Sequence, residues 1–177
     1  MLINRYARYL LFVLMVSTSF MLGACNAANN GSEADQSDIS LYNSAYSISF
    51  DSYEQGDESG FILDEYALDE PTMFVIRTQE DLDAFWSIHS AIFFPQPDVP
   101  QIDFTQDMLI AVVDTVQPTG GYALNIVDIV SSEGTVSVEV EKVSPGPDCL
   151  VTDALTIPYH IIILPQTDME FILQIIE

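Results

Sequence analysis

The sequence predicts an α+β domain in which β structure dominates: a curled or sandwich-like antiparallel sheet of about seven or eight strands with one amphipathic helix. Three observations lead to this prediction. Short apolar runs recur after residue 44, turn-forming residues separate them, and one segment alone has the apolar spacing of a helix. We find no internal repeat. The folded part has about 130 residues, which is enough to build one core, and only one is expected.

The predicted helix begins after Thr78. The pattern Thr78-x-x-Asp81 resembles a capping box, and acidic residues occupy the first turn, where the helix dipole favours them. Apolar or aromatic residues follow at helical spacing, namely Leu82, Phe85, Trp86 and His89. This stripe should cover one face of a sheet, which makes Trp86 and His89 core residues rather than ligands.

The strand predictions rest on alternation and on continuous apolar runs. Residues 46–51 alternate, with Tyr46, Ile48 and Phe50 on one side, whereas residues 108–113 are apolar throughout and indicate a central strand. Residues 122–129 and 135–142 are typical of a hairpin with a turn at 131–134, where Gly134 can adopt a positive φ. Further strands are predicted at 61–66, 73–77, 150–157, 160–164 and 171–176, and the proline-rich segment 93–100 is predicted to be an extended surface loop.

The N-terminus resembles a bacterial lipoprotein precursor. Arg5 and Arg8 precede an apolar run over residues 9–22, and Leu22-Gly-Ala-Cys25 resembles a lipobox. The resemblance implies cleavage after residue 24 and lipidation of Cys25. An uncleaved membrane-spanning helix needs about 20 apolar residues, and this run is shorter and interrupted at 17–19; secretory cleavage without lipid transfer is the second alternative.

Three parts of the chain follow from these patterns. Residues 1–24 are expected to be a signal peptide, 25–44 the lipidated cysteine and a flexible tether, and 45–177 one globular domain. The tether segment is rich in Asn, Ala, Ser, Asp and Gln and contains too little apolar surface to fold alone. About 19 flexible residues reach roughly 25 Å, which keeps the domain near its membrane.

The charge of the chain excludes several functions. The chain has 4 basic residues against 27 acidic ones and a formal net charge of −23. After residue 24, Arg77 and Lys142 are the only strong bases. Such a charge repels nucleic acids, so no nucleic-acid partner is expected. The acidic residues favour attraction to a basic partner or to divalent cations, or else form a simple solvated surface. The segment Asp51–Gly56 begins like a calcium loop, but Ile62 occupies the position that needs a bidentate carboxylate.

No recognised catalytic motif is present, and we expect neither an enzyme nor a cofactor or metal site. The remaining candidate for chemistry is Cys149 with His160. Cys149 follows Asp148 in a strongly acidic chain, which disfavours the thiolate. Cys149 is instead expected at the start of a strand, packed or partly shielded. His89 and His160 without a second available cysteine make a poor metal site, so we expect both to be hydrogen-bonded core or rim residues.

Two glycine- and proline-containing loops are the candidate binding sites. Residues 118–122 contain two consecutive glycines, and residues 144–149 place prolines on both sides of a glycine. Loops of this kind turn the chain, and they also present backbone groups to partners. The candidate partner-binding residues are Thr119, Gly120, Gly121, Tyr122, Pro145, Gly146, Pro147 and Cys149.

Five segments in order resemble the C-terminal domain of the PrcB family, a lipoprotein subunit of a bacterial surface protease complex. They are residues 80–86, 107–113, 118–122, 144–149 and 158–165, and Gln166 stands where the family leads us to expect a basic residue. The resemblance implies an accessory protein that binds and stabilises an envelope partner such as a surface protease, with no assigned catalytic residue. A protease inhibitor that uses the Gly-Gly loop is the alternative, and an enzyme dependent on Cys149 is a further one. The expected location is the cell envelope; with Asn26 in place of Asp, it is the outer membrane in a cell with two membranes.

Overall fold

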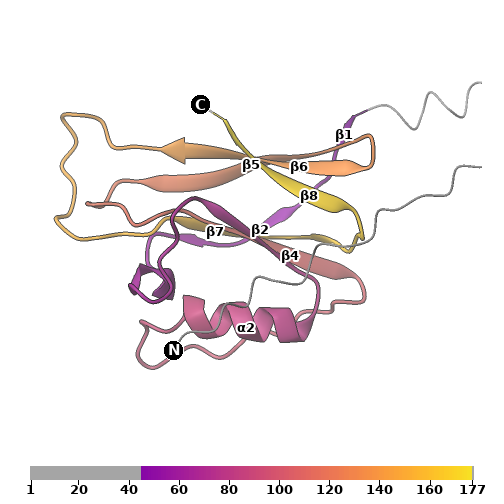
Figure 1. Cartoon of the computed structure of the whole chain (residues 1–177), viewed down its shortest axis with the longest axis horizontal. Coiled ribbons are helices and arrows are strands. Elements are labelled where there is room, and N and C mark those ends of the chain that lie inside the picture. The colour runs from indigo at the N-terminus through magenta and orange to yellow at the C-terminus, as the bar shows by residue number, and fades with distance from the viewer. Residues whose placement is uncertain (1–44, 177) are drawn as a thin grey trace, which may run out of the picture. The chain divides into compact units, whose positions relative to one another are not determined.

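The computed structural model describes residues 45–176, and the predictions for residues 1–44, including the signal peptide and Cys25, lie outside this range. Within it, the chain forms two four-stranded sheets and a helix in three layers (Figure 1). The β-dominant α+β sandwich predicted from the sequence is therefore confirmed. No helix in the described range is long and apolar enough to cross a membrane.

The outer sheet has the strand order β1-β5-β6-β8. Its strands are β1 (Tyr46–Ser47), β5 (Ala123–Ser132), β6 (Thr135–Val143) and β8 (Glu170–Ile176). The pair β6–β8 is parallel, which departs from the predicted antiparallel sheet, whereas β1–β5 and β5–β6 are antiparallel. The parallel pair arises because β7 lies in the other sheet, so the chain crosses the sandwich before β8 returns beside β6.

The middle sheet has the order β2-β7-β4-β3 and is antiparallel throughout. Its strands are β2 (Asp51–Gly56), β7 (Tyr159–Pro165), β4 (Asp107–Val113) and β3 (Thr72–Ile76). The helix α2 (Gln79–His89) covers one face of this sheet and the outer sheet covers the other (Figure 1). Strand β4 is consequently buried from Met108 to Val113, as the continuous apolar run predicted.

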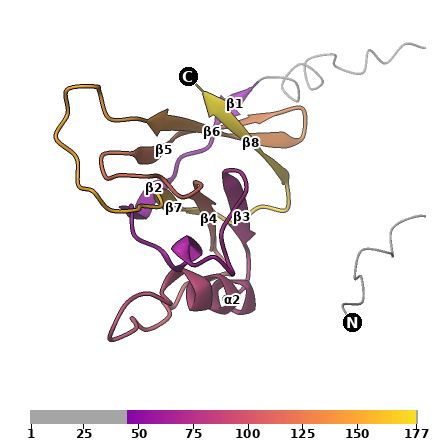
Figure 2. The same cartoon turned by 60° about the vertical axis from the view of Figure 1, so that its left-hand side comes forward.

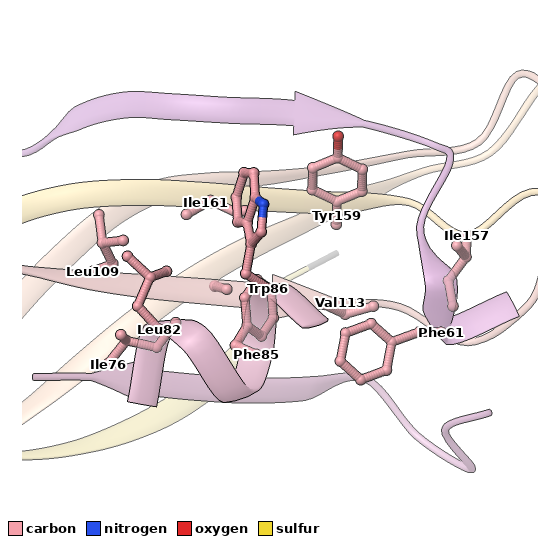
Figure 3. Close-up of a cluster of buried hydrophobic side chains, with 11 residues drawn as sticks. Phe61, Ile76, Leu82, Phe85, Trp86, Leu109, Val113, Ile157, Tyr159 and Ile161 are labelled. Carbon is pink, nitrogen blue, oxygen red and sulfur yellow. The ribbon is translucent and has the colours of Figure 1, made fainter. Parts of the chain in front are cut away.

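Two apolar clusters hold the layers together. Between the sheets, alternate side chains of β5 and β6, including Val136, Val138 and Val140, pack against β4 and β7. Between the middle sheet and α2, Leu82, Phe85 and Trp86 pack against the opposite face of the same strands (Figure 3). Odd-numbered residues of β4 belong to the cluster beside α2 and even-numbered residues to the cluster between the sheets, because successive side chains of a strand point to opposite faces.

The predicted helix is confirmed at its start and along its apolar stripe. The Thr78 hydroxyl accepts a hydrogen bond from the Asp81 amide at 3.1 Å, which satisfies one of the free amides of the first turn. Leu82, Phe85, Trp86 and His89 are the buried residues of α2. The segment after the helix, residues 91–106, forms turns and bends without strand structure, in agreement with the predicted loop.

Three strand predictions are wrong. Residues 46–51 do not form one strand, because the chain leaves the outer sheet after Ser47 and joins the middle sheet at Asp51. Residues 61–66 form a 3₁₀ turn, η1 (Gly60–Ile62), and bends instead. A side chain on Gly60 would collide with the carbonyl oxygen of Ile88, so this glycine lets the segment pass against the end of α2. Contacts with the helix thus outweigh the strand propensity of the segment.

Residues 150–157 also lack a strand. Their one regular contact is an isolated bridge between Gln117 and Thr156. The alternation of apolar residues is interrupted at Thr152 and Asp153, and Leu150, Val151 and Leu155 are exposed. The segment lies along the connection between β4 and β5 and does not add a strand to either sheet.

Substitutions at two turn residues of the β5–β6 hairpin should change the free energy of unfolding in opposite directions. Glu133 and Gly134 both have positive φ, 52° and 83°, and a side chain on Gly134 would meet no atom within 4 Å. Replacement Gly134→Ala should therefore lower the free energy of unfolding by about 1–2 kcal/mol through backbone strain alone. Glu133→Asn should raise it by a few tenths, because Asn tolerates positive φ. Urea denaturation measures both; equal stability of Gly134→Ala and wild type would contradict the explanation.

Candidate functional site: the loop end

Two long connections leave the sandwich at the same end. The segment 114–122 links β4 to β5, and the segment 144–158 links β6 to β7; together we call them the loop end. Strand register places them side by side, because Val113 pairs with Tyr159 in the middle sheet and Ala123 pairs with Val143 in the outer sheet. Figure 1 shows the 144–158 connection spanning from the outer to the middle sheet at this end.

Backbone hydrogen bonds join the two connections. Gln117 and Thr156 exchange two of them, at 2.7 and 3.0 Å, and the Gly120 amide donates to the carbonyl of Thr152 at 3.0 Å. The Thr156 hydroxyl donates to the carbonyl of Thr119 at 2.8 Å. The two loops predicted separately from their glycines and prolines are therefore parts of one surface.

The two glycines of the first loop have different roles. Gly120 is buried, and a side chain there would collide with the Thr152 hydroxyl, so Gly120 permits the close approach of the two connections. Gly121 is exposed and has φ of +88°. A side chain on Gly121 would lie 3.0 Å from Val151 and 3.1 Å from Pro145, which shows how closely the second connection packs against it.

An ion pair lies at the base of the loop end. Lys142 Nζ is 2.7 Å from Asp114 Oδ1, and the Asp114 side chain is 2% exposed whereas that of Lys142 is 35% exposed. Asp114 Oδ1 also accepts the Thr115 amide at 2.8 Å, and the Asp114 amide donates to the Pro158 carbonyl at 2.8 Å. A buried carboxylate without a cation is costly, so the pair fixes the end of β6 against the end of β4.

Apolar side chains project from this surface. The exposed fraction is 104% for Leu150, 62% for Leu155 and 40% for Val151. These residues are not among the predicted binding residues, because the apolar run at 150–157 predicted a strand there. The interruption of the apolar alternation at Thr152-Asp153 is the signal that could have indicated a loop.

The predicted binding residues differ in exposure. Gly121, Gly146, Pro147 and Cys149 are exposed, Thr119, Tyr122 and Pro145 are partly buried, and Gly120 is buried. Their role in binding stays a prediction. Cys149 is neither packed nor at the start of a strand: it ends a turn in which its amide donates to the Gly146 carbonyl at 3.0 Å.

His160 joins the two sheets from the middle of the sandwich. Its Nδ1 accepts the Ile126 amide of the outer sheet at 2.9 Å, so Nε2 carries the proton and donates to the Ser52 hydroxyl at 2.9 Å. The Ile126 amide is free for this contact because β5 has an irregular register between Ile126 and Asp128. Burial lowers the pKa of His160 below its usual value near 6.5. With both nitrogens bonded, His160 is not available as a base for Cys149.

A second polar cluster lies beneath α2. His89 is 1% exposed, its Nδ1 is 2.9 Å from the hydroxyl of Ser59, and its Nε2 is 3.4 Å from Glu54. Glu54 also accepts the Tyr159 hydroxyl at 2.8 Å. The hydrogen bond from His89 lowers the pKa of Glu54, and burial, together with the bond to Glu54, raises the pKa of Tyr159.

This Ser59–His89–Glu54 cluster combines the residue types of a serine nucleophile site, but Ser59 is fully buried. A nucleophile needs access to its substrate, so the cluster has a structural role. Both histidines are hydrogen-bonded core residues, as predicted. Sequence reasoning could not find the cluster, because Ser59 and His89 lie 30 residues apart. Across residues 45–176, no three side chains of His, Cys, Asp or Glu are arranged to hold a metal ion.

A comparison with protein families supports the resemblance seen in the sequence. Residues 108–165 match the family model described as PrcB C-terminal. Over this segment the chain is similar to the PrcB C-terminal family. The match begins in β4 and ends with β7, so it contains the hairpin, the ion pair and both connections of the loop end. The helix α2, in which the sequence also resembles the family, lies outside it. No curated protein and no solved structure matches the chain.

The buried state of His160 predicts a pH dependence of stability. Because its pKa is lowered on folding, the unfolded chain binds a proton more readily as the pH falls below about 6.5. The free energy of unfolding should then decrease toward lower pH, by at most about 1.4 kcal/mol per pH unit for this one group. Chemical denaturation between pH 7.5 and 5 measures the slope.

Two variants test the assignment to His160. His160→Gln should have a smaller slope in this range than wild type, whereas Ser52→Ala, which keeps the imidazole, should retain it. The usual pKa of Glu54, 4.5, lies below this range, and folding lowers it further. A full wild-type slope in His160→Gln would show that another group is responsible.

Proposed function

We propose that the protein is a lipid-anchored, non-enzymatic component of the bacterial envelope, on the outer membrane where the cell has two membranes, that binds and stabilises a partner such as a surface protease through the loop end. The observation that carries the proposal is the group of exposed apolar side chains on the packed connections, within the PrcB C-terminal segment. Leu150 is fully exposed, Val151 follows it in the chain, and Leu155 is exposed on the same connection. Exposed apolar surface of this kind lowers solubility and marks interaction sites.

The geometry of the loop end favours docking over inhibition. The Gly120 amide is bonded to Thr152, and the Thr119 carbonyl is bonded to Thr156. An inhibitory loop binds a protease cleft like a substrate, through its free backbone groups. At these two residues, the backbone groups already form hydrogen bonds within the protein. Hydrogen bonds hold the two connections together, and the exposed side chains Leu150 and Leu155 are apolar, which suits binding to an outer face of the partner.

Replacing the exposed leucines should weaken partner binding without unfolding the domain. The double variant Leu150→Ser/Leu155→Ser removes two apolar side chains and should reduce capture of the partner at least roughly tenfold. The control Ile172→Ser replaces an apolar side chain on β8 that is 46% exposed, against 104% and 62% for the two leucines, and should leave capture unchanged. Photo-cross-linking in intact cells from position 147 measures capture, and the unfolding midpoints of all variants should agree within about 2 °C.

The lifetime and activity of the captured partner distinguish the possible outcomes. A longer lifetime of an active protease supports the accessory role, whereas loss of protease activity on adding the protein supports the inhibitor alternative. Equal capture by wild type and the double variant would place the interface elsewhere and contradict the proposal.

The anchor itself gives a separate prediction. Cys25→Ser should move the protein from the membrane fraction to the soluble fraction, since no acyl chain can be attached. Partner capture in cells should fall because the tether no longer raises the local concentration. Cys149→Ser is the matched control and should remain in the membrane fraction. Fractionation followed by immunoblotting measures both, and membrane retention of Cys25→Ser would contradict lipidation at this residue.

A further inference from the structure

An open groove lies between strand β3 and helix α2, on a part of the fold that the loop end does not include. Its volume is about 420 Å³. The residues that line it come from β3, from α2 and from η1, and most of them are apolar: Phe61, Met73, Phe74, Val75, Ile76, Asp81, Ala84, Phe85 and Ile88.

The groove follows the outer edge of β3. Phe74 and Ile76 face α2, whereas Met73 and Val75 face the core between the sheets. All four consecutive residues line the groove. A groove that touches both faces of a strand must run along its edge, where the backbone of β3 is also reached.

Strand β3 has an unpaired edge. It is the last strand of the middle sheet and pairs with β4 alone, as Figure 2 shows beside α2. No described residue forms a backbone hydrogen bond with the other side of residues 73–76. Proteins usually block such edges. Here β1 is two residues long and β2 has a bulge between Ser52 and Glu54, but β3 has no charge, proline or bulge.

The charges around the groove indicate the kind of segment that would bind. Asp81 lines the groove, and Glu80 and Asp83 are exposed on the same helix. The two strong bases of the described chain are engaged elsewhere. Arg77 donates to the carbonyls of Thr167 and Met169, at 3.0 and 2.8 Å, and Lys142 pairs with Asp114. A segment with basic residues is therefore complementary.

The same charges disfavour two other occupants. Residues 26–44 of this chain contain Glu33, Asp35 and Asp38 and no Lys or Arg. A second copy of the chain carries the same net charge of −23. Like charges placed together across an interface are destabilising. The charges therefore favour an occupant from a different polypeptide.

We propose that the β3–α2 groove binds an extended segment of a partner protein, which adds a strand to the edge of β3. The segment has apolar residues at alternate positions that enter the groove, and Lys or Arg near Asp81. Main-chain hydrogen bonds to β3 supply affinity, and the apolar pockets along α2 supply specificity. The five residues of β3 pair with about five residues of the segment, roughly 17 Å of extended chain.

Selection from a library of displayed twelve-residue peptides on the full chain tests the proposal. Peptides with basic residues beside alternating apolar ones should be enriched. Ala84→Trp fills the groove from an exposed position and should weaken the selected peptides at least tenfold by fluorescence anisotropy. Ser87→Trp, on the same helix but outside the groove lining, should change affinity less than twofold. Asp81→Asn should reduce the preference for basic peptides, and Asp83→Asn should not.

Backbone methylation distinguishes strand addition from general apolar binding. In an added strand, the amides of alternate peptide residues face β3. N-methylation of those residues should abolish binding, whereas N-methylation of the residues between them should leave the affinity within about threefold. Hydrogen exchange of residues 72–76 should slow in the complex. No enrichment on wild type over Ala84→Trp, or equal effects of the two methylation patterns, would overturn the proposal. These outcomes are independent of the loop end, since the leucine variants should bind the peptides normally.

Discussion

The fold depends on a middle sheet that is covered on both faces. Strands β4 and β7 pack against the outer sheet on one side and against α2 on the other, so their side chains are removed from water in both directions. At about 25 cal/mol per Å² of buried apolar surface, this arrangement is the main source of stability. The same burial means that every polar group on these strands needs a partner within the protein.

The polar groups of the middle sheet meet this need in ways that also tie the layers together. His160 accepts a hydrogen bond from the Ile126 amide of the outer sheet. The bulge in β5 leaves this amide without a strand partner, and the buried imidazole nitrogen supplies one. Tyr159 and Glu54 connect β7 and β2, and His89 connects the same cluster to α2. At the end of β4, Asp114 is neutralised by Lys142 from β6. Each layer is thus joined to the middle sheet by apolar packing and by at least one specific polar contact.

The sequence predicted the elements whose signals are local. The Thr78 cap, the apolar stripe of α2 and the alternation of β6 depend on neighbours within a few residues, and all three are correct. The wrong strand predictions involve contacts between distant residues. Phe61 lies in a turn because Gly60 packs against the end of α2. Leu150 lies outside both sheets because its segment forms hydrogen bonds with the β4–β5 connection. The loop residues were found from their glycines and prolines, but their shared surface follows from strand register, which one sequence does not reveal.

The distribution of charge explains how exposed apolar surface is tolerated in this protein. Both strong bases of the described chain make internal contacts, so little positive charge offsets the exposed acidic side chains. Repulsion between copies then opposes self-association through the loop end or the β3 edge, although both would otherwise be prone to it. A partner with basic groups is attracted by the same field, and its association rate rises as the ionic strength falls. Net charge therefore disfavours association between copies of the protein through these apolar surfaces, whereas a basic neighbour would be attracted to them.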